Sequence, residues 1–288
     1  MSAAEEAPRN KTYEYREEIT VDEALKIFTG GRGIHTLPSP TDKKPIFVML
    51  FGPPGSGKST ALSKVQSLTT LNSEDAVIIS LDALVESVSS FRSNTAVIGQ
   101  HALNAKARGN QATINENFKA AAKPYLGIMM AKTNKRPGAV NGAKVGMNLN
   151  EIRKEALRIS VEAGKNIIYE RTAAKDLFEK EIFPLLEEQY RIFVIYPRVS
   201  EEVLKVRLAE RPFNHLKRNP PFFRVVTPSM AGRFITDSED YLKRIIQFKQ
   251  TGRIEGVFIL DGDAVTTIQG GTRKTRKHGR SRRRQTRR

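Results

Sequence analysis

The stretch that decides the fold runs from Pro45 to Thr60 and reads PIFVMLFGPPGSGKST. Its first half is a continuous apolar run, the pattern of a buried strand. Its second half matches Gly-x-x-x-x-Gly-Lys-Ser, the sequence of a phosphate-binding loop, and apolar residues at helical spacing follow at 61, 62, 65 and 68. The order strand, loop and helix is the one that the motif requires. The segment therefore predicts nucleotide binding; the alternative is a Gly-Pro turn with an incidental lysine.

The residue types of this loop have physical reasons. Glycines at 52, 55 and 57 allow tight turns that direct successive backbone N–H groups at one phosphate oxygen. Lys58 can reach the β- and γ-phosphates, and the Ser59 hydroxyl can hold Mg²⁺. We expect the whole loop to bind the nucleotide, namely Gly52, Pro53, Pro54, Gly55, Ser56, Gly57, Lys58, Ser59 and Thr60.

Four further strand patterns recur along the chain, at 76–81, 166–169, 192–196 and 257–260. Continuous β-branched runs that alternate with helices predict an α/β fold, in which a central parallel sheet is covered by helices on both faces. Asp261-Gly-Asp263 follows the last strand, and we expect a turn there rather than a metal site.

The sequence divides into three parts. Residues 1–44 predict a helical appendage and a linker, with a helix that starts at Val21 and is capped through Thr20. Residues 45–268 predict the nucleotide-binding domain, and residues 269–288 predict a disordered basic tail.

Residues 92–150 contain no strand pattern and are rich in Ala, Asn, Gly and Lys. Helices are expected near 110–130 and 149–163. In a parallel α/β kinase this segment is where an acceptor-binding insertion would lie. A solvated helical excursion without catalytic importance is the alternative.

Composition sets further bounds. With 288 residues, 39% of them hydrophobic, the chain can bury one good core. The absence of cysteine excludes disulfides and thiolate metal sites, and no apolar run approaches the roughly 20 residues of a membrane span. The start MSAAEEAPRN has no secretory apolar region. We expect an intracellular protein, cytoplasmic or nuclear, that is neither secreted nor bound to a membrane.

The net charge of +17 is concentrated in the tail, where residues 273–288 hold ten Lys and Arg residues and no acidic residue. Such a segment binds phosphate backbones through counterion release, without sequence specificity. We expect nonspecific contact with nucleic acid or another polyanion. Nuclear import and packaging with nucleic acid are alternatives.

The order of motifs resembles the zeta toxin family of P-loop kinases, within the larger group of polynucleotide kinase and chloramphenicol phosphotransferase. The resemblance covers roughly residues 45–263. After the loop it rests on IISLD ending at Asp82, GKNIIYERT ending at Thr172, IFVIYPRVSEEVLKVRLAER from 192 to 211, and RVVTP beginning at Arg224. The tail is also similar to basic tails of proteins from large DNA viruses, which is consistent with an infected host cell or a virion as its location.

Three carboxylates are candidates for the chemistry. Asp82 ends a strand, where side chains of open α/β sheets point into the ligand crevice, and we predict it as the base for an acceptor hydroxyl. A helix N-cap is the alternative for Asp82. Glu170 resembles an acidic position that orients Mg²⁺, or is a plain strand-end charge. Glu155 resembles a substrate-contacting glutamate, or lies on a helix surface.

Three arginines bracket the segment from Pro212 to Pro221, which is so rich in proline and basic residues that we expect a lid rather than a buried element. Arginines that close on the γ-phosphate stabilise the charge of the transition state. We predict that Arg211 and Arg224 contact phosphate. Arg207 shares one helix face with Arg211 and either binds substrate or is a surface charge, and Arg218 is expected to be solvated.

The resemblance implies an ATP- and Mg²⁺-dependent kinase that transfers the γ-phosphate to a hydroxyl of a small acceptor such as a nucleotide sugar. One alternative is a kinase of polynucleotide 5′-hydroxyl ends, tethered to its substrate by the tail. Another is a nucleic-acid-binding accessory protein with a vestigial nucleotide site. The joint presence of Lys58, Ser59, Asp82 and the arginines favours a kinase, because a relic need not keep them all.

Overall fold

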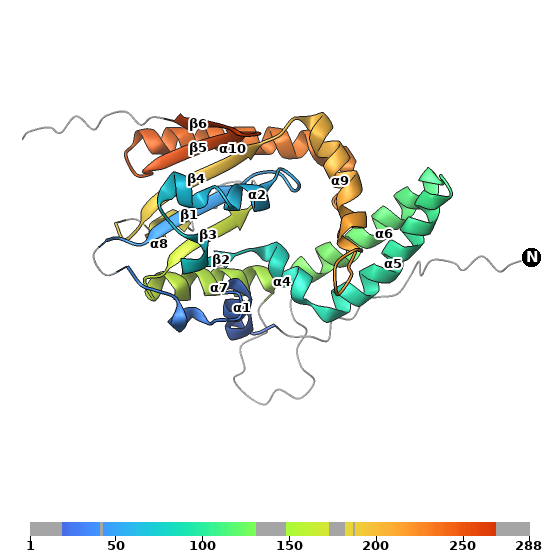
Figure 1. Cartoon of the computed structure of the whole chain (residues 1–288), viewed down its shortest axis with the longest axis horizontal. Coiled ribbons are helices and arrows are strands. Elements are labelled where there is room, and N and C mark those ends of the chain that lie inside the picture. The colour runs from blue at the N-terminus through green and yellow to red at the C-terminus, as the bar shows by residue number, and fades with distance from the viewer. Residues whose placement is uncertain (1–18, 41–42, 131–147, 173–181, 187, 269–288) are drawn as a thin grey trace, which may run out of the picture.

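The computed structural model describes residues 19–40, 43–130, 148–172, 182–186 and 188–268. A six-stranded sheet forms its centre, in the order β2-β3-β1-β4-β5-β6 (Figure 1). The strands are β1 (Ile46–Phe51), β2 (Ala76–Ile79), β3 (Asn166–Arg171), β4 (Arg191–Arg198), β5 (Gly256–Asp261) and β6 (Ala264–Ile268). The first five strands are parallel and confirm the predicted α/β sheet. The turn at residues 262–263 is also confirmed; it leads into β6, an antiparallel edge strand that the sequence pattern did not predict because most of it is exposed.

Strand β1 lies in the middle of the sheet, where all six of its residues are buried. Phe47 pairs with Ile167 of β3 on one side and with Ile192 of β4 on the other. The chain passes from β1 to strands on one side and later crosses to strands on the other. Ligands of open α/β sheets bind at such a point, outside the carboxyl ends of the strands.

Helices cover both faces of the sheet, as predicted. Along β1, Phe47, Met49 and Phe51 face one core cluster, whereas the alternate residues of the strand face another. The first cluster is completed by α1 (Val21–Phe28), α4 (Leu81–Ser87), α7 (Leu149–Glu162), α8 (Phe183–Leu186) and α10 (Ala231–Gln250). The second is completed by α2 (Lys58–Leu62) and α3 (Val65–Thr69). Short 3₁₀ helices lie at Ile34–Thr36, Ser73–Asp75 and Pro228–Met230.

The helix predicted in the N-terminal part is α1, and its capping box between Thr20 and Glu23 is present. Three of its residues, Ala24, Leu25 and Phe28, are buried in the first core cluster. The described part of residues 1–44 therefore packs into the core of the domain. The boundary at residue 44 stays a prediction.

Two long helices, α5 (Ser89–Ala107) and α6 (Gln111–Met130), form a hairpin that projects from the sheet (Figure 1). The helices predicted near 110–130 and 149–163 are confirmed as α6 and α7, whereas α5 was not predicted as a separate helix. An apolar cluster joins the hairpin to the rest of the protein, with Phe118 of α6 packed against Phe213 and Phe223 at ring-centroid distances of 5.8 and 5.7 Å.

Helix α9 (Glu201–His215) runs into the segment expected to form a lid. Pro212, Phe213 and His215 are buried, so the expectation that this segment contains no buried element is wrong for its first residues. A proline within a helix removes one backbone hydrogen bond, but burial of Phe213 against the α5–α6 hairpin opposes that loss. Residues 217–221 are exposed.

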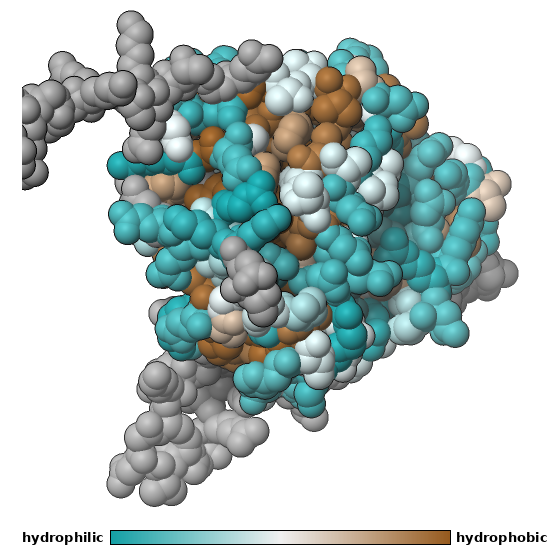
Figure 2. All heavy atoms as spheres, turned by 60° about the vertical axis from the view of Figure 1, so that its left-hand side comes forward, coloured by the Kyte–Doolittle hydropathy of each residue, from teal (hydrophilic) through white to brown (hydrophobic). Residues whose placement is uncertain are grey.

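Hydrophilic side chains predominate on the face shown in Figure 2, with smaller apolar patches between them. Within the described parts of the chain, no helix has both the length and the apolar character that a membrane crossing requires.

Candidate active site

The phosphate-binding loop joins β1 to α2 at the carboxyl end of the sheet. Its backbone turns through left-handed conformations at Gly55 (φ 84°) and Gly57 (φ 101°), which side-chain-bearing residues rarely adopt. The Lys58 ammonium donates hydrogen bonds to the carbonyl oxygens of Gly52 and Pro53, both at 3.0 Å. Burial lowers the pKa of Lys58 to about 8, although Asp82 nearby opposes this shift. The loop is thus folded around the Lys58 ammonium group, which its own carbonyl oxygens hold in place.

A cavity of about 400 Å³ opens beside this loop. Its charged and polar walls come from the loop, from α4, from the end of β3 and from α9. The lining residues are Gly55, Gly57, Lys58, Ser59, Thr60, Asp82, Glu170, Arg207, Glu210, Arg211, Asn214, His215 and Arg218. Four cations, two hydroxyls and loop glycines are a donor set that fits a polyphosphate and its Mg²⁺.

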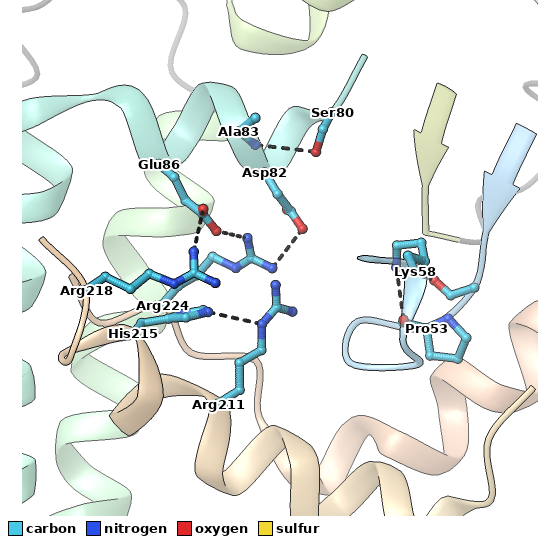
Figure 3. Close-up of polar contacts among 11 residues, drawn as sticks. Pro53, Lys58, Ser80, Asp82, Ala83, Glu86, Arg211, His215, Arg218 and Arg224 are labelled. Carbon is cyan, nitrogen blue, oxygen red and sulfur yellow. Dashed lines mark hydrogen bonds and ion pairs between the residues drawn. The ribbon is translucent and has the colours of Figure 1, made fainter. Parts of the chain in front are cut away.

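Asp82 lies in the first turn of α4 and lines this cavity. The N-cap of α4 is Ser80, whose hydroxyl accepts a hydrogen bond from the backbone N–H of Ala83 at 3.4 Å. The N-cap alternative for Asp82 is therefore wrong. Its carboxylate accepts a hydrogen bond from Arg224 at 2.7 Å (Figure 3).

Arg224 does not line the cavity. Its side chain is 1% exposed and donates to two carboxylates, Asp82 and Glu86, each at 2.7 Å. These two residues are one helical turn apart on α4, and Figure 3 shows both pointing at the same guanidinium group. The predicted contact between Arg224 and phosphate stays a prediction, whereas its position assigns it these two carboxylates.

Arg207 and Arg211 both line the cavity, as their shared helix face predicts. Arg207 donates to the carbonyl oxygens of Gly55 and Ser56 in the loop, both at 3.4 Å. The Nε of Arg211 donates to Nε2 of His215 at 3.3 Å.

His215 is a neutral acceptor at the edge of this arginine cluster. It is 2% exposed and stacks on Phe222, with ring centroids 4.5 Å apart. Burial, followed by the positive charges of Arg211, Arg224 and Arg218, lowers the pKa of His215 to about 3. At neutral pH its imidazole therefore holds the Arg211 side chain without adding charge.

The remaining predicted residues separate into two groups. Glu170, near the end of β3, lines the same cavity as Asp82, so the structure brings it together with Lys58. Arg218 also lines the cavity, with a side chain that is 58% exposed. Glu155 is not among the lining residues; it forms an ion pair with Arg158 on α7, at 2.6 Å.

Sequence reasoning missed Glu86, Glu210, Asn214 and His215. The signal for two of them was helical spacing, because Glu86 lies four residues after Asp82 and His215 lies four residues after Arg211.

A second cavity, of about 660 Å³, lies between the α5–α6 hairpin and α9, and shares Glu210 with the first. Its walls combine aromatic and apolar side chains, such as Phe118, Phe213 and Ile114, with Lys106 and Lys119. The Lys106 ammonium lies 4.4 Å from the centre of the Phe213 ring.

The fold and the loop define a P-loop nucleotide-binding protein. The family described as AAA domain matches residues 47–222, more than half of the chain, and the chain belongs to this family. No curated protein gives a significant match. A solved structure described as the PezAT chromosomal toxin–antitoxin system of the human pathogen Streptococcus pneumoniae is 16% identical, with 89% of this chain and 82% of that chain covered and a TM-score of 0.46.

Proposed function

We propose that the protein is an ATP- and Mg²⁺-dependent phosphotransferase that moves the γ-phosphate to a hydroxyl of a small acceptor. The observation that carries this proposal is that Lys58, Asp82, Arg207 and Arg211 line one cavity, although they come from three separate segments of the chain. The loop supplies nucleotide binding, and the carboxylate beside it adds a group that can accept a proton from an acceptor hydroxyl.

The proposal gives roles to the loop backbone and to five residues that line the cavity. Loop N–H groups and Lys58 bind the phosphates, and the Ser59 hydroxyl holds Mg²⁺, which neutralises phosphate charge when bound. Arg207 and Arg211 stabilise negative charge on the transferred group. Asp82 accepts the proton of the acceptor hydroxyl.

The acceptor is proposed to be a small molecule, such as a nucleotide sugar. The second cavity supports this proposal, since its volume of about 660 Å³ is typical of small-molecule sites and it adjoins the first at Glu210. A polynucleotide 5′-hydroxyl end is the second candidate, because the ten positive charges of residues 273–288 would retain nucleic acid on the protein. Zeta toxin membership and a viral source stay predictions from sequence.

The test is transfer of labelled γ-phosphate from ATP·Mg²⁺ to separate pools of nucleotide sugars, nucleosides and 5′-hydroxyl oligonucleotides. Lys58→Ala and Asp82→Asn are each expected to lower transfer by about 10²–10⁴-fold. Matched controls are Lys243→Ala and Asp240→Asn, an exposed ion pair on α10 at 2.9 Å, which should leave transfer unchanged. The pool that gains label names the acceptor class. Transfer that survives in both site variants would contradict the proposal, as would a protein that does not bind ATP.

A further inference from the structure

Two carboxylates of one helix share a single buried guanidinium group. Arg224 donates from one terminal nitrogen to Asp82 and from the other to Glu86, and both distances are 2.7 Å. The Arg224 side chain is 1% exposed, Glu86 is 22% exposed and Asp82 is 34% exposed. Asp82, which lines the cavity, is thus joined through a buried arginine to Glu86, which is not among the lining residues.

The charges around Glu86 come from four elements. Asp82 lies on the same helix, Arg211 on α9, Arg218 just after α9, at 3.7 Å from Glu86, and Arg224 on the segment before α10. Burial raises the pKa of Glu86, Arg224 opposes this rise, and the negative charge of Asp82 adds to it. By reciprocity, an ionised Glu86 also raises the proton affinity of Asp82.

We propose that Glu86 is a positioning residue that acts on Asp82 through Arg224. It takes up one side of the guanidinium group, so that Arg224 is fixed in place and neutralises Asp82 only in part. Asp82 is thereby held at the cavity wall as a stronger base than a carboxylate that is the sole partner of an arginine. The effect on transfer rests on the function proposed above, whereas the electrostatic link between the three residues does not.

Removal of the negative charge of Glu86 changes the surroundings of Asp82 in two ways. Asp82 loses a neighbouring negative charge, and Arg224 is left with Asp82 as its only partner of the two. Both changes favour ionised Asp82. In Glu86→Gln we therefore expect the titration midpoint of Asp82 to fall by about one pH unit. We also expect phosphoryl transfer to fall by about tenfold, with KM for ATP within about twofold of the wild-type value, because a weaker base remains beside an intact phosphate loop.

The experiment is a carboxyl ¹³C NMR titration of the full-length protein labelled at aspartate, in which Asp82→Asn assigns the resonance. The matched control is Glu255→Gln, which removes the charge of a glutamate that pairs with Arg191 outside the cavity, and the Asp82 midpoint should not move. Glu86→Asp keeps the charge and should give a midpoint between those of the wild type and Glu86→Gln. An unchanged midpoint in folded Glu86→Gln overturns the proposal. If neither Glu86 variant folds, Glu86 serves stability and the proposal is also overturned.

Two outcomes separate this inference from the proposed function. A shifted midpoint in a protein that labels no acceptor pool keeps the electrostatic link and rejects the kinase. Transfer that depends on Asp82 but not on Glu86, with an unmoved midpoint, keeps the kinase and rejects the positioning role.

Discussion

Replacing Arg224 with Met should destabilise the protein by about 3 kcal/mol at pH 7, the lower end of the range for breaking a buried ion pair. Met keeps much of the side-chain volume, so loss of charge rather than of packing decides the result. Two charge-assisted hydrogen bonds at 2.7 Å disappear, and each contributes about 1.5–3 kcal/mol. The lower end applies because Asp82, at 34% exposure, regains water.

The penalty should depend on pH in a direction that the structure fixes. The pKa of Glu86 is already raised above its ordinary value of 4.5, chiefly by burial, and Arg224 restrains that rise. Without Arg224 the pKa rises further, so folded Arg224→Met binds more protons than the unfolded chain above pH 4.5. Its stability therefore improves, relative to the wild type, as the pH falls from 7 toward 4.5.

Urea denaturation followed by circular dichroism, at several pH values, measures both effects. A loss of about 3 kcal/mol corresponds to a decrease in Tm of about 6–12 °C for a domain of this size. The control is Arg198→Met, which breaks the pair with Glu239 at 2.9 Å between side chains that are 42% and 30% exposed, and should cost less than about 1 kcal/mol. The reasoning is refuted if Arg224→Met costs no more than Arg198→Met, or if its cost is independent of pH.

Three further predictions concern the loop, the hairpin and the tail. Burial lowers the pKa of Lys58 to about 8 in the free protein, and bound phosphates raise it. ATP binding at pH 8–8.5 should therefore take up a proton and weaken as the pH rises. Calorimetry in buffers of different ionisation enthalpy should detect this proton uptake in the wild type and not in Lys58→Ala. Gly99→Ala places a Cβ 2.6 Å from Leu216 and 2.8 Å from Phe223. We therefore expect the free energy of unfolding, measured by heat or urea, to fall by about 1–3 kcal/mol, despite the better helix propensity of alanine. An unchanged stability would contradict the packing argument. Deleting residues 270–288 should abolish salt-sensitive retention on DNA and leave ATP turnover intact, and retention that survives the deletion rejects the role of the tail.

The sheet could be predicted from sequence because its signals are local. Each of the five parallel strands contains a continuous apolar run, and the phosphate loop follows β1 directly. The edge strand β6 and the continuation of α9 through Pro212 could not be predicted in this way. An exposed strand lacks the apolar pattern, and a proline inside a helix reads as a break unless its tertiary contacts are known.

The site divides in the same manner. The loop, Asp82 and the shared face of Arg207 and Arg211 were found from motif, strand end and helical spacing. The pairing of Arg224 with Asp82 was not found in this way, because 142 residues separate the two along the chain. The contact between Arg224 and phosphate stays a prediction from sequence, which cannot show that packing buries this arginine beside two carboxylates.

The pairing of Asp82 with Arg224, two residues far apart in the sequence, depends on the α5–α6 hairpin. The Thr95 hydroxyl of α5 accepts a hydrogen bond from the backbone N–H of Phe223 at 3.1 Å, and Phe223, with no exposed surface, packs against the same helix at Gly99. Because Arg224 is the next residue, α5 fixes where its guanidinium group meets Asp82. The phosphate loop depends on the hairpin less directly, since it is formed by consecutive residues between β1 and α2 and meets α9 through Arg207. A substitution that loosens the hairpin should therefore impair phosphoryl transfer while ATP binding remains. The phosphate loop and the Asp82–Arg224 pair would then differ in how strongly they depend on the hairpin.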